Sequence, residues 1–322
     1  MILYPCWNAM ASDAMQNGEI VMAKFMIQPH GRLNDWVADE KGYFRDAGLD
    51  YDINRNDGRA NADRSKSLDT DAPLPDVVSG AYESYTSGHG RKGAGAGDIS
   101  CACHWTVNQA AKVEEGVMWG GSYSVADGCV LVAGDSELQR PEDLAGHEVA
   151  VGFHSGSHYS TVQGLEVFLD PADINLKFAG LPWARVDIAL AEKVDAVNVW
   201  GPQRYVLEQQ GFRKLVDTSF MMSFMFPGTT DEQDVGRYME GMRRAQMDID
   251  LEPELYKHYF MNEIPERFHD MIDIRRFGTG ERIVFLPYSE TMFEKTQGWM
   301  HERKLFDVGP EVGVSYETAV HT

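Results

Sequence analysis

The feature that most constrains this chain is a regular alternation of strand and helix patterns across its middle third. Short apolar runs rich in Val alternate with longer segments whose apolar residues recur at helical spacing. This alternation is typical of parallel strands joined by right-handed helical crossovers, and it predicts an α/β layer. The predicted strands cover 147–153, 175–179, 194–200 and 212–218, and the predicted helices cover 159–169, 183–193 and 202–210.

The flanking segments are less regular. We predict the preceding strands at 21–27, 49–53, 98–104, 117–123 and 128–133, with helices at 33–46, 76–86 and 105–112. A polar stretch at 54–73 predicts a long surface loop, and 88–97 predicts a glycine-rich turn. Beyond residue 222 the pattern is mostly helical, with helices at 231–250, 252–260 and 289–304 and a tail at 308–322.

Composition and charge limit the partners of the protein. The chain has 322 residues, of which 43% are hydrophobic, and this is enough for two lobes with cores of their own. Its formal net charge of −21 opposes nucleic acid and anionic membranes, so we expect neither as a partner. An anionic ligand would need a locally positive pocket.

The expected compartment is the cytoplasm. No stretch approaches 18 consecutive apolar residues, so we predict no transmembrane helix. Residues 1–20 contain no Lys or Arg and no apolar core, so we expect no export signal. The chain has four cysteines, and Cys101 and Cys103 are too close for an easy disulfide, so we expect free thiols.

Three segments carry a family likeness. They are A-x-x-x-G-Y-F-x-x-x-G-L-D at 38–50, D-L-x-G-x-x-V-x-V-G followed by G-S-H at 143–158, and A-L-x-x-x-V-D-A followed by W-G-P at 189–202. In order and spacing they resemble the sulfonate, nitrate and taurine binding proteins. Those proteins share a superfamily with hydroxymethylpyrimidine precursor synthases and aromatic sulfinate desulfinases.

The resemblance implies an α/β, two-lobed periplasmic-binding-protein-like type II fold, with the ligand cleft between the lobes. One discontinuous lobe would contain residues 1–122 plus 219–322, and the inserted lobe 123–218. The related desulfinases carry a nucleophilic Cys in the loop after the first strand, whereas this chain has Pro29 and His30 there. That nucleophile therefore does not transfer.

Four loops at predicted strand ends carry the candidate site, because ligands of such folds meet strand C-termini and the helices that follow. In the first, His30 offers proton transfer and Arg32 a bidentate carboxylate clamp, although an exposed His and a capping Arg are an equal alternative. In the second, a helix N-terminus is expected to lower the pKa of Cys103, with His104 beside it as a base. Cys101 is expected to be a core residue.

The third loop, at 153–159, is the strongest candidate. Gly156 permits close backbone approach, and Ser155 or Ser157 can cap the following helix. Together with free backbone N–H groups, they predict a cradle for a carboxylate, a sulfonate or a developing oxyanion. The spacing leaves open whether His154 or His158 faces the ligand.

The fourth loop follows the last strand of the inserted lobe. Trp200 offers a flat face to a cyclic ligand and Asn198 a polar contact, while a core role for Trp200 is an equal alternative. The catalytic candidates are therefore Cys103, His104, His30 and His158. The ligand-binding candidates are Arg32, His154, Ser155, Gly156, Ser157, Tyr159, Asn198 and Trp200.

Two functions fit these residues. The first is a cytosolic lyase or hydrolase that cleaves a C–S or C–C bond of a small anionic, cyclic molecule. The second is a solute-binding protein of an ABC importer for a sulfonate, nitrate or similar anion. Neither requires a cofactor, and the C-x-C-H spacing at 101–104 is incomplete for zinc, so we expect no cofactor and no metal.

Overall fold

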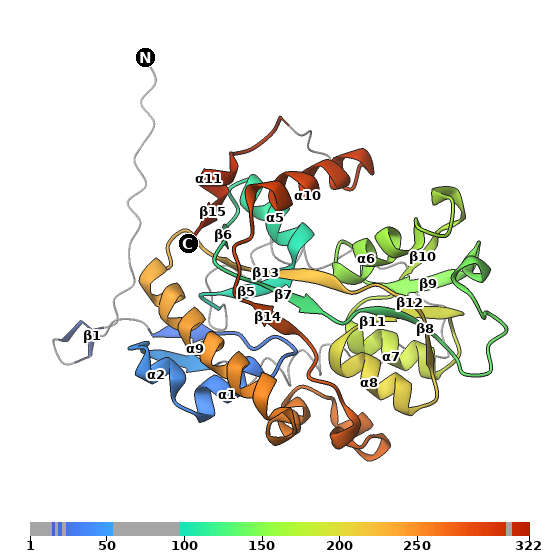
Figure 1. The fold of residues 1–322 in the computed structure, drawn as a ribbon, viewed down its shortest axis with the longest axis horizontal. Coiled ribbons are helices and arrows are strands. Elements are labelled where there is room, and N and C mark those ends of the chain that lie inside the picture. Colours follow the sequence, from blue (N-terminus) through green and yellow to red (C-terminus); the bar gives the residue numbers. More distant parts are fainter. Residues whose placement is uncertain (1–14, 17–18, 21–23, 54–96, 307–310) are drawn as a thin grey trace.

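The computed structural model describes residues 15–16, 19–20, 24–53, 97–306 and 311–322 (Figure 1). The predicted loop at 54–73, the helix at 76–86, most of the turn at 88–97 and the start of the strand at 21–27 lie outside these ranges. Within them, no helix is both long and apolar enough to span a membrane.

The middle third of the chain forms a five-stranded sheet in the order β10-β9-β11-β8-β12. Strands β9, β10 and β11 are parallel, as the alternation predicts. Strand β8 is antiparallel to both its neighbours and separates β12 from the parallel group. The strands are β8 (Cys129–Val132), β9 (Glu148–Val151), β10 (Asn175–Phe178), β11 (Ala196–Val199) and β12 (Arg213–Asp217).

Helices cover both faces of this smaller sheet. They are α6 (Gly156–Leu165) on one face and α7 (Pro182–Leu190) with α8 (Gly201–Gln209) on the other (Figure 1). Successive side chains of a strand point to opposite faces. Accordingly Val130 packs in the cluster with Leu165 of α6, while Leu131 packs in the cluster with Val186 of α7.

A second sheet has the order β14-β7-β13-β6-β15, with β5 also paired to β13. Its strands are β5 (Ser100–Cys103), β6 (Val117–Trp119), β7 (Tyr123–Ala126), β13 (Phe220–Phe226), β14 (Arg282–Val284) and β15 (Val320–His321). The chain passes to the smaller sheet between Ala126 and Cys129 and returns between Asp217 and Phe220. These crossings lie close to the predicted lobe boundaries at 123 and 218, although β7 itself pairs in the larger sheet.

The remaining elements are short strands, helices and 3-10 turns outside the two sheets. The short strands β3 (Phe25–Ile27) and β4 (Tyr51–Ile53) are parallel to each other, and β1 (Met15–Gln16) pairs with β2 (Glu19–Ile20). The helices are α1 (Asn34–Glu40), α2 (Tyr43–Asp46), α5 (His104–Lys112), α9 (Glu232–Leu251), α10 (Glu290–Glu302) and α11 (Tyr316–Ala319). Short 3-10 turns cover Pro141–Leu144, Pro171–Asp173, Pro253–Leu255, Lys257–Asn262, Glu266–Met271 and Ile274–Arg276.

Several predicted elements differ from the structure. The helix predicted at 33–46 is two helices, because Gly42 adopts φ 74°, a left-handed conformation that suits glycine. The strand predicted at 117–123 is broken at Gly120 and Gly121. The apolar run 220–226 forms β13, the central strand of the larger sheet, although the helical pattern was predicted to begin near it. The helix predicted at 252–260 is a pair of 3-10 turns.

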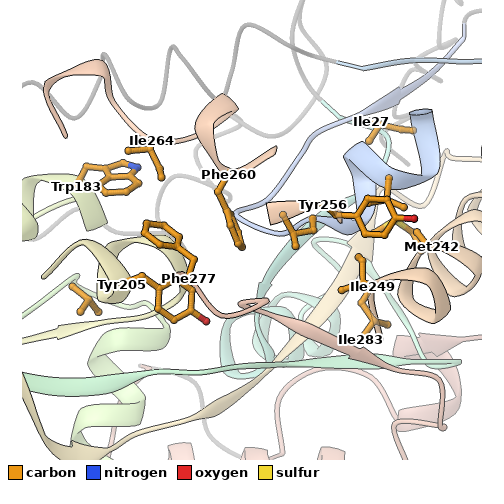
Figure 2. Close-up of a cluster of buried hydrophobic side chains, with 14 of the residues drawn as sticks. Ile27, Trp183, Tyr205, Met242, Ile249, Tyr256, Phe260, Ile264, Phe277 and Ile283 are labelled. Carbon is orange, nitrogen blue, oxygen red and sulfur yellow. The ribbon is translucent and has the colours of Figure 1, made fainter. Parts of the chain in front are cut away.

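One large apolar cluster links α7 and α8 to the 3-10 turns of the segment 257–276. In Figure 2, Trp183 lies beside Ile264, and Phe260 and Phe277 lie near Tyr205. The rings of Tyr205 and Phe277 are 5.0 Å apart between centroids. These contacts fix α7 and α8 against the segment 260–277, which lies between β13 and β14 of the larger sheet.

Candidate functional site

The four predicted loops gather around one aromatic side chain, Phe220 at the start of β13. His30 of the first loop stacks on Trp200 of the fourth, with ring centroids 5.4 Å apart and planes 12° apart. Trp200 meets Phe220 edge to face at 6.5 Å. A Cβ atom built on Gly156 of the third loop would lie 2.4 Å from the Phe220 ring. The first, third and fourth loops therefore converge, although they lie far apart in the sequence.

The space beside Gly156 is occupied by protein. Besides the Phe220 ring, the Cβ atom of Cys103 would lie 3.2 Å from a Cβ atom on Gly156. From the sequence, this glycine is expected to let the backbone approach a ligand. In the structure it lets the backbone approach Phe220 and Cys103. The second loop therefore joins the third at this point.

Hydrogen bonds within the 152–157 turn hold both of its serines. The Ser157 hydroxyl accepts from the Gly152 amide at 2.9 Å, and the Ser155 hydroxyl donates to the Gly152 carbonyl at 2.7 Å. Ser155 is the N-cap of α6, but its side chain makes no capping bond. The serines thus shape the turn and leave the first-turn amides of α6 without a side-chain cap.

Arg185 of α7 lies against the same turn. A Cβ atom built on Gly152 would be 3.0 Å from its Nη1 and 2.9 Å from the Ser155 hydroxyl. Its side chain is buried, with 2% exposed, and donates to the backbone carbonyls of Gly180 at 2.7 Å and Asn198 at 3.1 Å. Among the described residues, no carboxylate forms an ion pair with this guanidinium.

The charge of Arg185 therefore has no counter-charge among the described residues. Burial lowers the pKa of Arg185 to about 9, so the guanidinium still carries its charge at neutral pH. Isolated buried charges are costly, and native proteins usually pair them. An anion bound at the 152–157 turn would supply the missing partner.

The two histidines of the third loop belong to an aromatic stack. Their rings lie 5.9 Å apart at 8°, and the Nδ1 atom of His158 accepts from the His154 amide at 3.3 Å. Burial lowers the pKa of His158 to about 4, with a further contribution from His154, so His158 is neutral at physiological pH. Tyr159, predicted to bind the ligand, is fully buried and packs against Trp105. His154 is the more exposed of the two histidines.

The predicted pairing of Cys103 with His104 does not form. The Cys103 thiol contacts the Thr106 hydroxyl at 3.1 Å, whereas Nδ1 of His104 faces the Tyr288 and Thr296 hydroxyls, each at 3.3 Å. Burial raises the pKa of the Cys103 thiol to about 11 and lowers that of His104 to about 3. The expected lowering of the Cys103 pKa by the helix N-terminus is therefore outweighed by burial.

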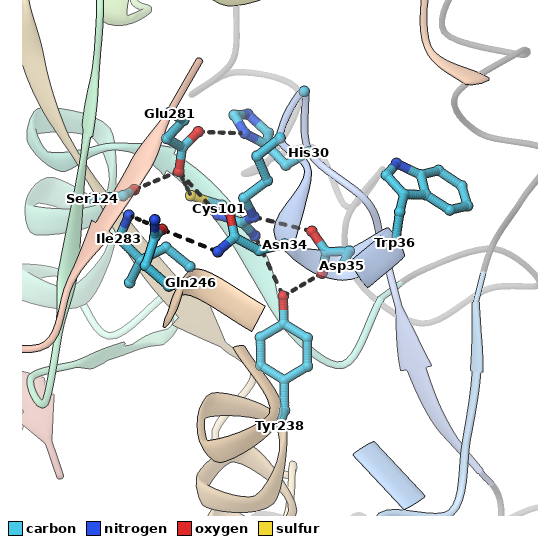
Figure 3. Close-up of polar contacts among 12 residues, drawn as sticks. His30, Asn34, Asp35, Trp36, Cys101, Ser124, Tyr238, Gln246, Glu281 and Ile283 are labelled. Carbon is cyan, nitrogen blue, oxygen red and sulfur yellow. Dashed lines mark hydrogen bonds and ion pairs between the residues drawn. The ribbon is translucent and has the colours of Figure 1, made fainter. Parts of the chain in front are cut away.

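Arg32 is engaged in a buried network and has no nitrogen left for a carboxylate clamp. Figure 3 shows its partners Asp35, Tyr238 and Glu281. Its Nε donates to Asp35 at 3.0 Å, its Nη1 to Glu281 at 3.0 Å and its Nη2 to the Tyr238 hydroxyl at 3.3 Å. Burial would lower the pKa of Arg32, but the Asp35 carboxylate and the other acidic groups around it raise it well above its ordinary value. Arg32 therefore stabilises the fold here.

Asn198 and the N-terminus of α8, which follows Trp200, both have partners within the protein. The Asn198 amide donates to the Thr161 and Thr218 hydroxyls, each at 2.8 Å, and its Oδ1 is buried without a hydrogen-bond partner among the described residues. Asn198 thus joins α6 to the end of β12. The N-terminal amide of α8 at Gly201 donates to Asp127 at 2.9 Å, so a protein carboxylate occupies that helix terminus.

Sequence reasoning missed three residues that shape this site: Arg185, Phe220 and Glu281. Arg185 lies in the helix predicted at 183–193, outside both the three family-like segments and the four candidate loops. Phe220 lies in the apolar run that was not recognised as a strand. Glu281 follows a turn at 278–280 and meets Arg32 across 249 positions of sequence. No local pattern marks a partner that distant.

The comparisons with known proteins agree on the fold. No protein-family model matches the chain, and no curated protein matches its sequence. Solved structures do match, among them the alkanesulfonate-binding protein SsuA of Xanthomonas axonopodis pv. citri bound to MOPS, with 16% identity and a TM-score of 0.63 over 93% of this chain and 98% of that one. The aliphatic sulphonate binding protein SsuA of Escherichia coli matches with 15% identity and a TM-score of 0.61, over 93% and 92%.

An enzyme shares the same fold. The desulfurization enzyme DSZB matches with 13% identity and a TM-score of 0.52, over 90% of this chain and 95% of that one. The chain therefore has the type II periplasmic-binding-protein fold, as the three sequence segments predicted. This is the fold of a class of proteins that hold small molecules, and it serves both binding proteins and enzymes.

Proposed function

We propose that the protein binds a small anionic molecule at the 152–157 turn, between its two sheets, with Arg185 as the positive partner. The uncompensated guanidinium of Arg185 carries this proposal. It is the buried cation next to the turn that the sequence had already singled out, and its described partners are backbone carbonyls.

Two features of the turn support an anion there. The N-terminus of α6 is without a side-chain cap, and a helix N-terminus favours negative charge. Trp200 stacks on His30 and contacts Phe220, which packs against Gly156 at the turn. The rings of His30 and Trp200 would therefore flank a cyclic ligand. The fold is shared with two sulfonate-binding proteins, so sulfonates, sulfinates and carboxylates form the first panel of ligands.

The test is isothermal titration of the full chain with each member of this panel, MOPS included. We expect one compound to bind one to one, and Arg185→Met to weaken it by about tenfold or more, because a charge-assisted bond is lost. Arg213→Met is the matched control, because Arg213 also donates to a backbone carbonyl, at Ser136, but lies on the edge strand β12. Equal affinities of wild type and Arg185→Met would contradict the proposal.

A cytosolic enzyme that cleaves a C–S or C–C bond is the second candidate. The observation that favours it is the position of Cys103 against Gly156, beside the proposed anion site. Against it stands the thiol itself, which is protonated at neutral pH and whose hydrogen-bond partner is Thr106. Mass spectrometry of the same panel separates the two functions: a binding protein returns its ligand intact, whereas an enzyme consumes more than one equivalent and loses turnover in Cys103→Ser.

A further inference from the structure

A second cluster of reactive side chains lies at the buried network of Arg32 and contains His30, Cys101 and Glu281. His30 comes from the loop after β3, Cys101 from β5, and Glu281 directly precedes β14 (Figure 3). Their ligand-type atoms all lie within 4.8 Å of one another. The Nδ1 atom of His30 is 3.3 Å from Oε2 of Glu281, and the Cys101 sulfur is 3.7 Å from Oε1.

These separations suit a metal ion. Ligands at roughly 2.0–2.3 Å from a tetrahedral zinc ion lie roughly 3.3–3.8 Å from one another. Imidazole nitrogen, thiolate sulfur and carboxylate oxygen are the ligand types that zinc takes in proteins. The 3.3 Å between His30 Nδ1 and Glu281 Oε2 falls in this range, and the three ligand atoms all lie within 4.8 Å of one another, so small side-chain shifts would complete the set.

The charges around the cluster also favour a bound cation. Three carboxylates meet here: the buried Asp35 and Glu281 on Arg32, and the partly exposed Glu263 on the amide of Gly31 at 2.6 Å. One guanidinium against three carboxylates leaves negative charge in excess.

Glu281 is held in an orientation that leaves one oxygen for an ion. Its Oε1 accepts from Arg32 at 3.0 Å and from the Ser124 hydroxyl, while its Oε2 faces His30. Such hydrogen bonds from surrounding residues orient and tune metal ligands.

We propose that His30, Cys101 and Glu281 bind a divalent transition-metal ion, with zinc as the best fit. Binding would convert the Cys101 thiol to a thiolate and release its proton to solvent, because the metal takes the deprotonated ligand. Three protein ligands leave the fourth tetrahedral position for water or a bound anion, the arrangement of catalytic zinc sites. This proposal departs from the sequence analysis, which expected no metal, and it does not depend on the proposed anion site.

Cobalt(II) titration of the full chain, stripped beforehand with chelator, tests the site, because a thiolate ligand gives cobalt a near-ultraviolet charge-transfer band. We expect one equivalent of cobalt to bind with this band and zinc to displace it. Cys101→Ser should abolish the band, and His30→Ala should weaken binding by about tenfold or more. Cys129→Ser, another buried cysteine, is the matched control and should keep the band.

His30→Ala keeps the test decisive if Cys101→Ser fails to fold, because the His30 side chain is about a quarter exposed, at 26%. Absence of stoichiometric binding, or a band that survives either substitution at full affinity, would overturn the proposal. Arg185→Met should keep the cobalt band, so a failed anion site and a failed metal site give different results.

Discussion

The protein buries two arginines in opposite ways. Arg32, with 1% of its side chain exposed, has a carboxylate on two of its nitrogens and a phenol on the third. Arg185, with 2% exposed, has two backbone carbonyls. The surroundings raise the pKa of the first and lower that of the second.

This is the difference that we expect between a structural cation and the ligand-binding cation that we propose. A buried charge whose partners are built into the fold contributes to stability only as part of its network, and loss of one member strands the others. Burying a charge without a counter-charge costs free energy. We therefore expect such a charge at a place where a bound ligand supplies the counter-charge. Exposure alone does not distinguish the two arginines, but their partners do.

The largest expected effect follows from removal of the paired arginine. Arg32→Met should lower the free energy of unfolding by about 3–5 kcal/mol, because Asp35 and Glu281 would be left as unpaired buried carboxylates. Urea unfolding followed by circular dichroism measures this loss. Arg243→Met, which breaks an exposed pair with Glu240, should cost about 1 kcal/mol or less. Similar losses in both variants would show that the Arg32 network contributes no more than a surface pair.

A buried histidine sharpens the comparison, because it avoids a buried charge by giving up its proton, which arginine does not do. Burial lowers the folded-state pKa of His104 to about 3. Between this value and the unfolded pKa of about 6.5, the unfolded state binds the extra proton, so stability falls as the pH falls. The slope from this one residue should approach about 1.4 kcal/mol per pH unit within the window.

Urea titrations at about pH 7, 5.5 and 4.5 check this dependence. His104→Gln should flatten the slope, while His301→Gln, a substitution at an exposed position of α10, should leave it unchanged. An unchanged slope in His104→Gln would mean that His104 is not held neutral by burial.

The smallest effect is expected from removal of the unpaired arginine in the absence of ligand. Arg185→Met should change the free energy of unfolding by about 1 kcal/mol or less, or raise it, because an uncompensated charge is replaced by an apolar side chain. The same urea titration measures it beside Arg32→Met. A loss as large as that of Arg32→Met would make Arg185 a structural residue and remove the basis of the anion site.

Local patterns determined much of this protein. The alternation over 147–218 predicted the strands and helices of the smaller sheet, and three short segments predicted the fold that solved structures then confirmed. The four loops at strand ends were located from the same patterns, because strand and helix periodicity depend on neighbours within a few residues. The strand β13 was not predicted, because its almost entirely apolar sequence has no periodicity that distinguishes a strand from a helix.

Only the tertiary structure decided what the charged residues do. The sequence offered Arg32 as a ligand clamp, but Glu281 reaches it from 249 positions away and completes a buried network. No sequence pattern indicated Arg185. Arg185 stands out because none of the described residues places a carboxylate on its guanidinium. Cys103 and His104 were predicted to be a nucleophile and its base. In the structure, burial keeps both groups neutral, and each has a separate partner. Ionisation depends on desolvation and on partners brought together by folding, and a local sequence pattern contains neither.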